Sequence, residues 1–200
     1  MELLLIRHAE PVEEHTSDGS PADPALTERG RAQSEALARW LAREGLDVLV
    51  SSPARRAQET AAAVALLLGK DVEIESRVRD ANADADSYVP LEADRKGDRA
   101  GYHARLASYR ESPRLTSIAE RVNEALDDWT TRLRGGRLAV FCHGSVINVF
   151  AARVLGLGNA AFLEADYASA HRFLVSRKGI RSVKSLNETA YLLSDKLLSD

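Results

Sequence analysis

The stretch Met1-Glu-Leu-Leu-Leu-Ile-Arg-His-Ala-Glu10 decides how this chain is organised. Its apolar residues Leu3 to Ile6 run without a break, which is typical of a strand buried on both faces of a sheet. Arg7 and His8 follow at once, at the carboxyl end of that strand, where open α/β sheets place their binding crevices. From these residues alone, two interpretations stay open: the beginning of a binding site, or the point where a strand meets water.

A second apolar strand, expected at residues 47–50, leads directly into a helix start. Ser52 and Pro53 follow it, so we expect Ser52 to cap the helix and Pro53 to lie in the first turn. Arg55 and Arg56 then fall in that turn, where cations oppose the helix dipole. Two cations in an unfavourable place suggest a bound anion, although each arginine alone could equally be a solvated surface residue.

A third apolar strand, expected at residues 138–142, also ends in a histidine. His143 and Gly144 follow it, and we expect a helix from Val146 to Leu155. The free N–H groups of this helix begin near Gly144 and suit an anion. A structural role is the safer interpretation for either histidine alone, but His8 and His143 both follow buried strands, and that coincidence favours a shared site.

Helices and strands alternate along the rest of the chain. Thr27 is a natural N-cap for a helix that Gly45 ends, and the apolar residues from Leu115 to Leu133 fall on one helical face. The remaining expected strands are Val72–Glu75 and two edge strands around Arg172–Val175 and Arg181–Val183. This alternation predicts a layered α/β fold, and we expect one domain over residues 1–200.

Residues 76–113 lack a clear periodicity and are rich in Asp, Arg, Ala and Tyr. A long segment of this kind inside a compact domain is usually a functional loop or a small insert. Its tyrosines and arginines suit a substrate lid, and a solvated insert with helical pieces is an equal alternative.

The composition argues against several classes of function. A net charge of -3 leaves no basic surface for nucleic acid and no polybasic patch for a membrane. Cys142 is the single cysteine, so no internal disulfide can form. No apolar run reaches transmembrane length and the apolar start is too short for a signal peptide, so we expect a cytoplasmic protein. The sequence leaves the oligomeric state open, a homo-oligomer included.

The strand ends, if they converge, form a site with two imidazoles, at least two guanidiniums and a helix N-terminus. That set suits a tetrahedral dianion such as a phosphoryl group. One histidine could act as nucleophile, and the other could stabilise the transition-state charge. A cysteine-dependent phosphatase loop is absent, because Asn148 and not arginine lies six residues after Cys142. The histidines also lack HxH or HExxH spacing, which makes a metal site a minor alternative.

Three blocks of the sequence resemble the histidine phosphatase superfamily, which is phosphoglycerate-mutase-like. They are Leu3-Leu-Leu-Ile-Arg-His-Ala-Glu10, with Ala9 in place of the usual glycine, Ser51-Ser-Pro-Ala-Arg-Arg-Ala-Gln-Glu-Thr60 and Phe141-Cys-His-Gly-Ser-Val-Ile-Asn148. Residues 26–30 and 185–190 also resemble stretches of its phosphatase branch. The resemblance implies a three-layer α/β/α sandwich with a mostly parallel central sheet, and a phosphatase that needs neither metal nor cofactor.

The resemblance also implies roles for the strand-end residues. His8 matches the residue that becomes phosphorylated, and His143 matches the second histidine. Arg7 and Arg56 match the phosphate-binding arginines; Arg56 is preferred to Arg55 because the family arginine directly precedes an alanine.

The family further uses a carboxylic acid that protonates the leaving oxygen and later activates water. The glutamate expected after the third strand is missing from this chain. Asp80 is the best positional match, and Asp84, Asp86 and Glu92 stay open. Because aspartate is one methylene shorter than glutamate, its backbone would have to approach the site more closely.

The mutase branch usually carries Trp-Asn and Arg-rich blocks shortly after the first histidine, whereas residues 11–17 here include two acids. We therefore expect phosphomonoester hydrolysis, on a small phosphorylated metabolite or a phosphoprotein. The missing glutamate and Ala9 motivate an alternative from another class, a catalytically weak module on the same fold that binds a phosphorylated ligand or regulates a partner.

Overall fold

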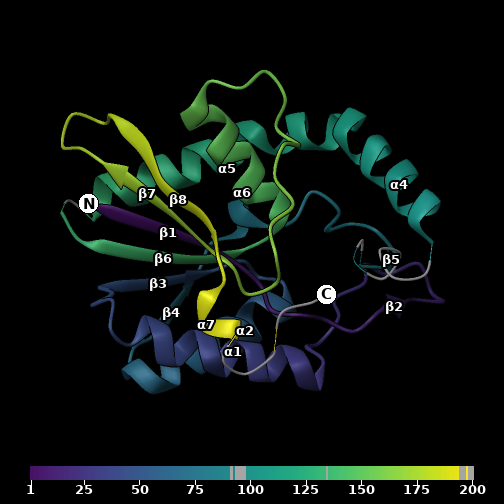
Figure 1. The fold of residues 1–200 in the computed structure, drawn as a ribbon, viewed down its shortest axis with the longest axis horizontal. Coiled ribbons are helices and arrows are strands. Elements are labelled where there is room, and N and C mark those ends of the chain that lie inside the picture. The colour runs from purple at the N-terminus through teal and green to yellow at the C-terminus, as the bar shows by residue number, and fades with distance from the viewer. Residues whose placement is uncertain (91, 93–97, 134, 194–196, 198–200) are drawn as a thin grey trace.

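A six-stranded sheet forms the centre of the computed structural model, which describes residues 1–90, 92, 98–133, 135–193 and 197 (Figure 1). The strands lie in the order β4 (Val72–Ile74), β3 (Val48–Ser51), β6 (Arg137–Cys142), β1 (Glu2–Arg7), β7 (Ala170–Val175) and β8 (Arg181–Glu188). The first four are mutually parallel, and β7 runs antiparallel to β1 and β8. The predicted α/β fold with a mostly parallel central sheet is confirmed.

One expectation about this sheet is wrong. We expected the strands near Arg172 and Arg181 both to lie at an edge, but β7 lies between β1 and β8, and of these two strands β8 alone lies at an edge. Because β7 contains polar residues, its sequence does not indicate that the strand is buried. Arg172 is only 7% exposed, because it donates to Glu44 at 2.7 and 2.8 Å and to Glu188 at 2.9 Å.

Helices cover both faces of the sheet and make three layers (Figure 1). Leu3 and Leu5 of β1 belong to one core, with α5 (Pro113–Arg132) and α6 (Gly144–Leu155). Leu4 and Ile6 point the other way, into a second core with α1 (Glu28–Leu41) and α2 (Arg55–Leu68). All four side chains are fully buried, so β1 is the two-faced strand that its apolar run predicts.

The start of α1 follows its sequence signal. Thr27 caps the helix, and its hydroxyl accepts a hydrogen bond from the backbone N–H of Gly30 at 2.9 Å. The helix ends at Leu41, before Gly45. Gly30 also lies against the loop after β1: a Cβ at this position would be 2.1 Å from the backbone oxygen of Glu10. Only glycine therefore lets α1 approach that loop so closely.

The start of α2 differs from the expectation. The N-cap is Ala54, not Ser52, and no side chain of the cap accepts a hydrogen bond there. Asp23 supplies the missing acceptor, since its carboxylate accepts from the backbone N–H of Arg55 at 2.8 Å. Ser52 stays in the turn before the helix, because its hydroxyl is held by His143 at 2.8 Å.

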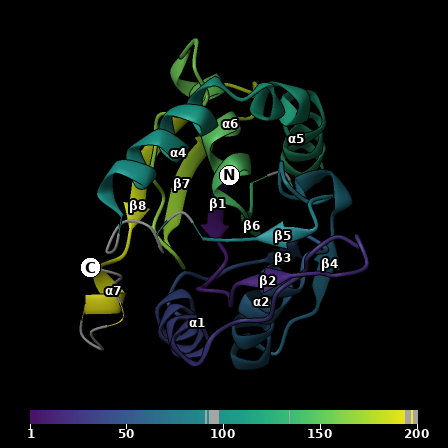
Figure 2. The same ribbon diagram turned by 90° about the vertical axis from the view of Figure 1, so that its right-hand side faces the viewer.

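The segment without periodicity contains short elements. A 3-10 helix, η1 (Ser76–Val78), is followed by β5 (Ser87–Tyr88), which pairs with β2 (Glu14–His15), and by α4 (Arg99–Glu111). These elements lie at the carboxyl end of β1 (Figure 2). That residues 76–113 act as a lid, and that residues 1–200 form one domain, stay predictions.

The last helix, α7 (Ala190–Leu193), contacts α1, where Tyr191 stacks on Trp40 with ring centroids 4.5 Å apart. Among the helices of the described residues, none combines the length and the apolar character that a membrane span requires.

Candidate active site

The parallel strands β1 and β6 bring the two strand-end histidines together. Arg7 pairs with Cys142 across these strands, and the N–H of His8 donates to the carbonyl of Cys142 at 2.9 Å. His143 follows directly and is the N-cap of α6. The rings of His8 and His143 consequently lie 5.2 Å apart between centroids, each about 1% exposed.

The ring of His8 is held so that one nitrogen is free to react. Its Nδ1 lies 2.9 Å from the carbonyl oxygen of Ala9, a contact that requires Nδ1 to carry the proton. The lone pair is then on Nε2, which accepts a hydrogen bond from Arg56 Nε at 3.4 Å. Burial lowers the pKa of His8 far below its ordinary value, and Arg56, His143 and Arg7 lower it further. The imidazole is therefore neutral near pH 7, as a nucleophile must be.

Arg56 is the central cation of the site. It is 3% exposed, and its Nη2 lies 3.0 Å from Asp80 Oδ2 and 3.3 Å from His143 Nδ1. Because an arginine can only donate, Nδ1 of His143 is an acceptor, and its Nε2–H donates to the hydroxyl of Ser52 at 2.8 Å. Burial lowers the pKa of His143 although Asp80 opposes the shift. The neighbouring Arg55 is exposed and pairs with Glu59 at 2.7 Å.

The structure separates the four carboxylates that sequence alone left open. Asp84 pairs with exposed Arg79 at 3.1 Å, Asp86 is exposed at the rim, and Glu92 pairs with Arg7. Only Asp80, among these four, contacts both Arg56 and His143; its Oδ2 lies 3.8 Å from His143 Nδ1.

Two donors fix the other oxygen of Asp80. Ser145 donates its hydroxyl to Oδ1 at 2.6 Å, and the N–H of Ala81 donates at 2.8 Å. Burial on its own raises the pKa of Asp80, but the charge of Arg56 and the hydrogen bonds from Ser145 and Ala81 hold the pKa below its usual range. The carboxylate is ionised in the free protein, and the N–H of Ala81 also donates to the hydroxyl of Ser145 at 3.3 Å, which holds this turn against α6.

Arg7 is surrounded by groups whose contacts with it the sequence did not indicate. Its Nη1 donates to the carboxylate of Glu92 and to the backbone oxygen of Ala165. The ring of Tyr167 covers its guanidinium at 4.0 Å, and the ring of Tyr88 covers that of Arg56 at 4.5 Å. A tyrosine over each arginine holds the two guanidiniums in place through cation–π contacts. No periodicity or motif around Tyr167 could have indicated this contact.

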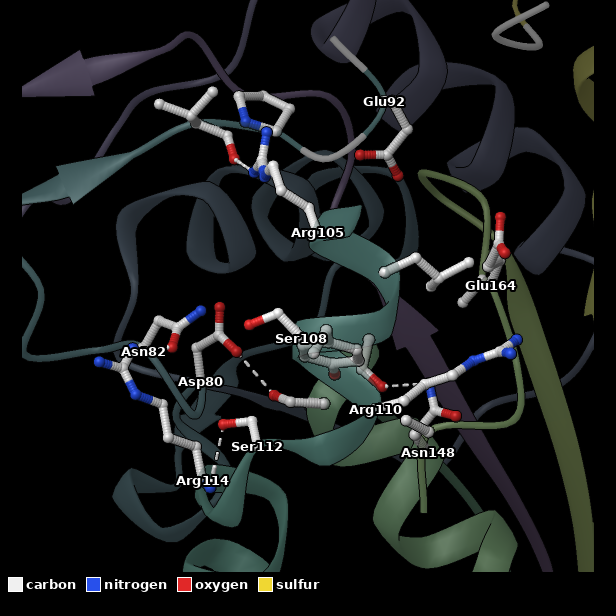
Figure 3. Close-up of a pocket in the computed structure, with 18 of the residues that line it drawn as sticks. Asp80, Asn82, Glu92, Arg105, Ser108, Arg110, Ser112, Arg114, Asn148 and Glu164 are labelled. Atoms are coloured by element: carbon white, nitrogen blue, oxygen red, sulfur yellow. Dashed lines mark hydrogen bonds between the residues drawn. The ribbon is translucent and has the colours of Figure 1, made fainter. Parts of the chain in front are cut away.

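A cavity of about 910 Å³ opens over His8. Arg7, Asp80, Gly144 and Ser145 border it at the sheet, while α4 forms another wall with Tyr102, Arg105, Ser108, Tyr109 and Arg110 (Figure 3). The first turn of α6, beginning at Gly144, lies at the same place and is capped by no side chain. Its N–H groups suit an anion. Within the described part of the chain, no three His, Cys, Asp or Glu side chains lie close enough to hold a metal ion.

The predicted site residues Arg7, His8, Arg56, Asp80, His143 and Gly144 thus lie together. Residues 93–97, which include the basic Arg95 and Lys96 of the segment expected to form a lid, lie outside the described residues.

Comparison with known proteins places this site in a family. The model of the histidine phosphatase superfamily (branch 1) matches residues 3–189. Phosphoserine phosphatase 1 of Hydrogenobacter thermophilus is 39% identical over 85 residues, which cover 39% of this chain and 37% of that relative. The match therefore spans well under two thirds of the relative's length.

Two solved structures share the fold. A mycobacterial glucosyl-3-phosphoglycerate phosphatase in complex with inorganic phosphate superimposes with a TM-score of 0.74 at 23% identity, covering 95% of this chain and 98% of the other. A phosphoserine phosphatase mutant from Entamoeba histolytica in complex with phosphoserine gives 0.72 at 18% identity, covering 96% and 98%. Because the family match runs over nearly the whole chain, and the rings of both histidines of its motifs lie 5.2 Å apart, this chain belongs to the histidine phosphatase superfamily.

Proposed function

We propose that this chain hydrolyses phosphomonoesters through a covalent phosphohistidine on His8. The observation that carries the proposal is the unprotonated Nε2 of the neutral, buried imidazole of His8, which accepts a hydrogen bond from Arg56 and belongs to a residue that lines the cavity. Arg7, Arg56 and the first turn of α6 at Gly144 would hold the phosphate oxygens. His143 would stabilise the charge on those oxygens in the transition state once its Nδ1 has taken up a proton, which a phosphate dianion beside it would favour.

The reaction has two displacements at phosphorus. His8 Nε2 attacks, the bond to the ester oxygen breaks, and Asp80 gives a proton to the departing alkoxide. Water then attacks the phosphohistidine, Asp80 takes a proton from it, and the N–P bond breaks to release inorganic phosphate and restore His8. A general acid or base in this position contributes about 100- to 10,000-fold in rate.

The protonation state of Asp80 has to change during this cycle. In the free protein, Arg56 and the hydrogen bond from Ser145 keep the carboxylate ionised. A phosphate dianion would draw Arg56 toward its own oxygens and add negative charge beside Asp80. Both effects raise the pKa of Asp80, so substrate binding itself would prepare the acid.

The substrate we propose is a small phosphorylated metabolite. A cavity of about 910 Å³ is of the size that encloses a whole small ligand, and its walls combine polar, aromatic and aliphatic side chains. A relative and a structural neighbour are phosphoserine phosphatases, which supports a substrate of that size. Four other expectations stay predictions. They are a phosphoprotein substrate, the absence of nucleic-acid and membrane partners, a homo-oligomer and a cytoplasmic location.

The decisive experiment is to trap the phosphoenzyme by denaturing it at alkaline pH, where an N–P bond survives, with an aryl phosphate labelled at phosphorus and no added metal. The parent and a His15→Ala control, which removes an exposed histidine on β2, should carry acid-labile label, and His8→Ala should carry none. Unchanged turnover in His8→Ala would contradict the phosphohistidine mechanism. No turnover by the parent across a broad panel of phosphomonoesters would favour the alternative, a catalytically weak binding or regulatory module.

A further inference from the structure

A bulge in the edge strand β8 places Asn187 in an unusual backbone conformation. The register of β7 and β8 shifts between Ala170 and Arg172, and Asn187 has a φ of 55°. Asparagine tolerates this left-handed region better than most residues. The N–H of Asn187 donates to Nδ1 of His171, at 3.1 Å, instead of to a carbonyl of β7. Bulges of this kind re-aim a side chain, and they occur often beside active sites.

The side chain of Asn187 is aimed at the loop that precedes β7. Its Nδ2 donates to the carboxylate of Asp166 at 2.7 Å, and its Oδ1 accepts from the N–H of Asp166 at 2.8 Å. The same loop is held from its other side, because Ser169 donates its hydroxyl to the carbonyl of Asp166 at 2.6 Å and contacts Nε2 of His171 at 3.0 Å. Asn187 therefore holds the side chain and the N–H of Asp166, and Ser169, which contacts His171, holds its carbonyl.

This loop carries the groups that surround Arg7. Ala165 supplies the carbonyl that accepts from Arg7, and Tyr167 supplies the ring that covers its guanidinium. The Tyr167 ring also lies 5.7 Å from that of His8, and Tyr167 is only 3% exposed. A shift of Asp166 would move the residues on both sides of it, and with them the guanidinium that meets the phosphate.

We propose that Asn187 is a positioning residue for the phosphate site: by clamping Asp166, it sets Ala165 and Tyr167 against Arg7 and so determines the affinity for phosphate. The inference rests on the proposed function, because it takes Arg7 to be a phosphate ligand. Residues 185–190 resemble a stretch of the phosphatase branch. The contacts with Asp166 give a physical reason for the asparagine at position 187 of that stretch.

The experiment separates the side chain of Asn187 from its backbone. Asn187→Gly keeps the left-handed conformation without strain and removes the amide, while Asn187→Asp sets one carboxylate against another. The double variant Asp166→Asn with Asn187→Asp exchanges the two groups, so one amide and one carboxylate face each other again. Ser182→Ala, at an exposed position of β8, is the matched control.

The readouts are the dissociation constant of inorganic phosphate by calorimetry, KM and kcat for an aryl phosphate, and the melting temperature. We expect phosphate to bind several-fold more weakly to Asn187→Gly and about tenfold more weakly to Asn187→Asp, as one lost charge-assisted hydrogen bond implies. The exchanged pair should recover most of this loss, and KM should change more than kcat.

Three results would overturn the inference. One is an unchanged phosphate affinity in Asn187→Gly with only a lower melting temperature, which would make the clamp purely structural. Another is an Asn187→Asp variant whose affinity the exchanged pair does not restore, because the effect would then not pass through Asp166. A third is an equal loss in Ser182→Ala. Absence of turnover in the parent would instead contradict the proposed function, and phosphate binding would still test the clamp.

Discussion

Glu92 forms an ion pair with Arg7, the arginine that would bind phosphate in the proposed mechanism. This ion pair leads to a quantitative prediction about phosphate affinity. Its carboxylate accepts from Arg7 and, at 3.0 Å, from the hydroxyl of Tyr167. The two charged side chains are only 12% and 24% exposed, so solvent screens the pair weakly. Burial raises the pKa of Glu92, but Arg7 outweighs it and lowers the pKa, which keeps the carboxylate ionised. A phosphate dianion must therefore compete with a resident anion for Arg7.

The variant Glu92→Gln weakens that competitor without removing it. The amide oxygen can still accept from Arg7, and the amide nitrogen can donate to the hydroxyl of Tyr167, but the bond to Arg7 is no longer an ion pair. Hydrogen bonds between charged groups exceed neutral ones by about 1 kcal/mol, which corresponds to a factor of about five in an equilibrium constant. We expect inorganic phosphate to inhibit Glu92→Gln at a concentration about fivefold lower than the parent.

The assay is competitive inhibition of aryl phosphate hydrolysis by inorganic phosphate near pH 7. Glu35→Gln is the matched control, because it removes one negative charge at an exposed position of α1 and should leave the inhibition constant unchanged. An inhibition constant that is equal or higher in Glu92→Gln would refute the reasoning, since Glu92 would then be assisting phosphate and not competing with it.

Three other perturbations have defined outcomes. Asp80→Asn should lower kcat by about 100- to 10,000-fold in steady-state assays, because the amide can neither give nor take the proton; a parent-like kcat would return the role to another carboxylate. Gly30→Ala should lower the free energy of unfolding by about 1–3 kcal/mol in urea titrations, since its Cβ would meet Glu10, whereas Gly158→Ala has open space and serves as control. Hydrogen bonds from Arg77 outweigh burial and lower the pKa of Glu75 to about 2. A lowered folded-state pKa stabilises the fold above the ordinary value of 4.5, and this stabilisation is lost as the pH falls toward 2. The difference in unfolding free energy between the parent and Glu75→Gln should therefore shrink between pH 4.5 and 2, and a constant difference would contradict the assignment.

The reactive strand ends could be predicted from sequence because they depend on local patterns. Apolar runs before His8 and His143 indicate buried strands, and parallel strands bring their carboxyl ends to one edge of a sheet. The order of residues in the chain then places both rings at that edge. Asp80 was harder to assign because η1, and not a strand, precedes it, and because its position depends on contacts with Ser145 of α6.

The contacts that hold these groups could not be predicted, because they join distant residues without a pattern. Arg7 and the carbonyl of Ala165 are 158 positions apart, and no periodicity marks the loop that carries Tyr167. The burial of β7 could not be predicted for a related reason. An arginine is normally expected at the surface, and Arg172 is buried because it pairs with Glu44 and Glu188. Ser52 has the chemistry of a helix cap, but tertiary contact with His143 gives it a different partner.

The cavity is divided between two parts of the chain in a way that bears on how such proteins diversify. The reacting groups come from the ends of β1 and β6, the start of α2 and the turn after η1, whereas much of the opposite wall comes from α4. Tyr102 is the buried residue of α4, so most positions of that helix can change without disturbing a core. Mutations along this one helix could exchange one phosphorylated molecule for another while the bond-breaking groups stay untouched. Substitutions in α4, a segment of thirteen residues, would thus change the ligand specificity and leave the reacting groups as they are.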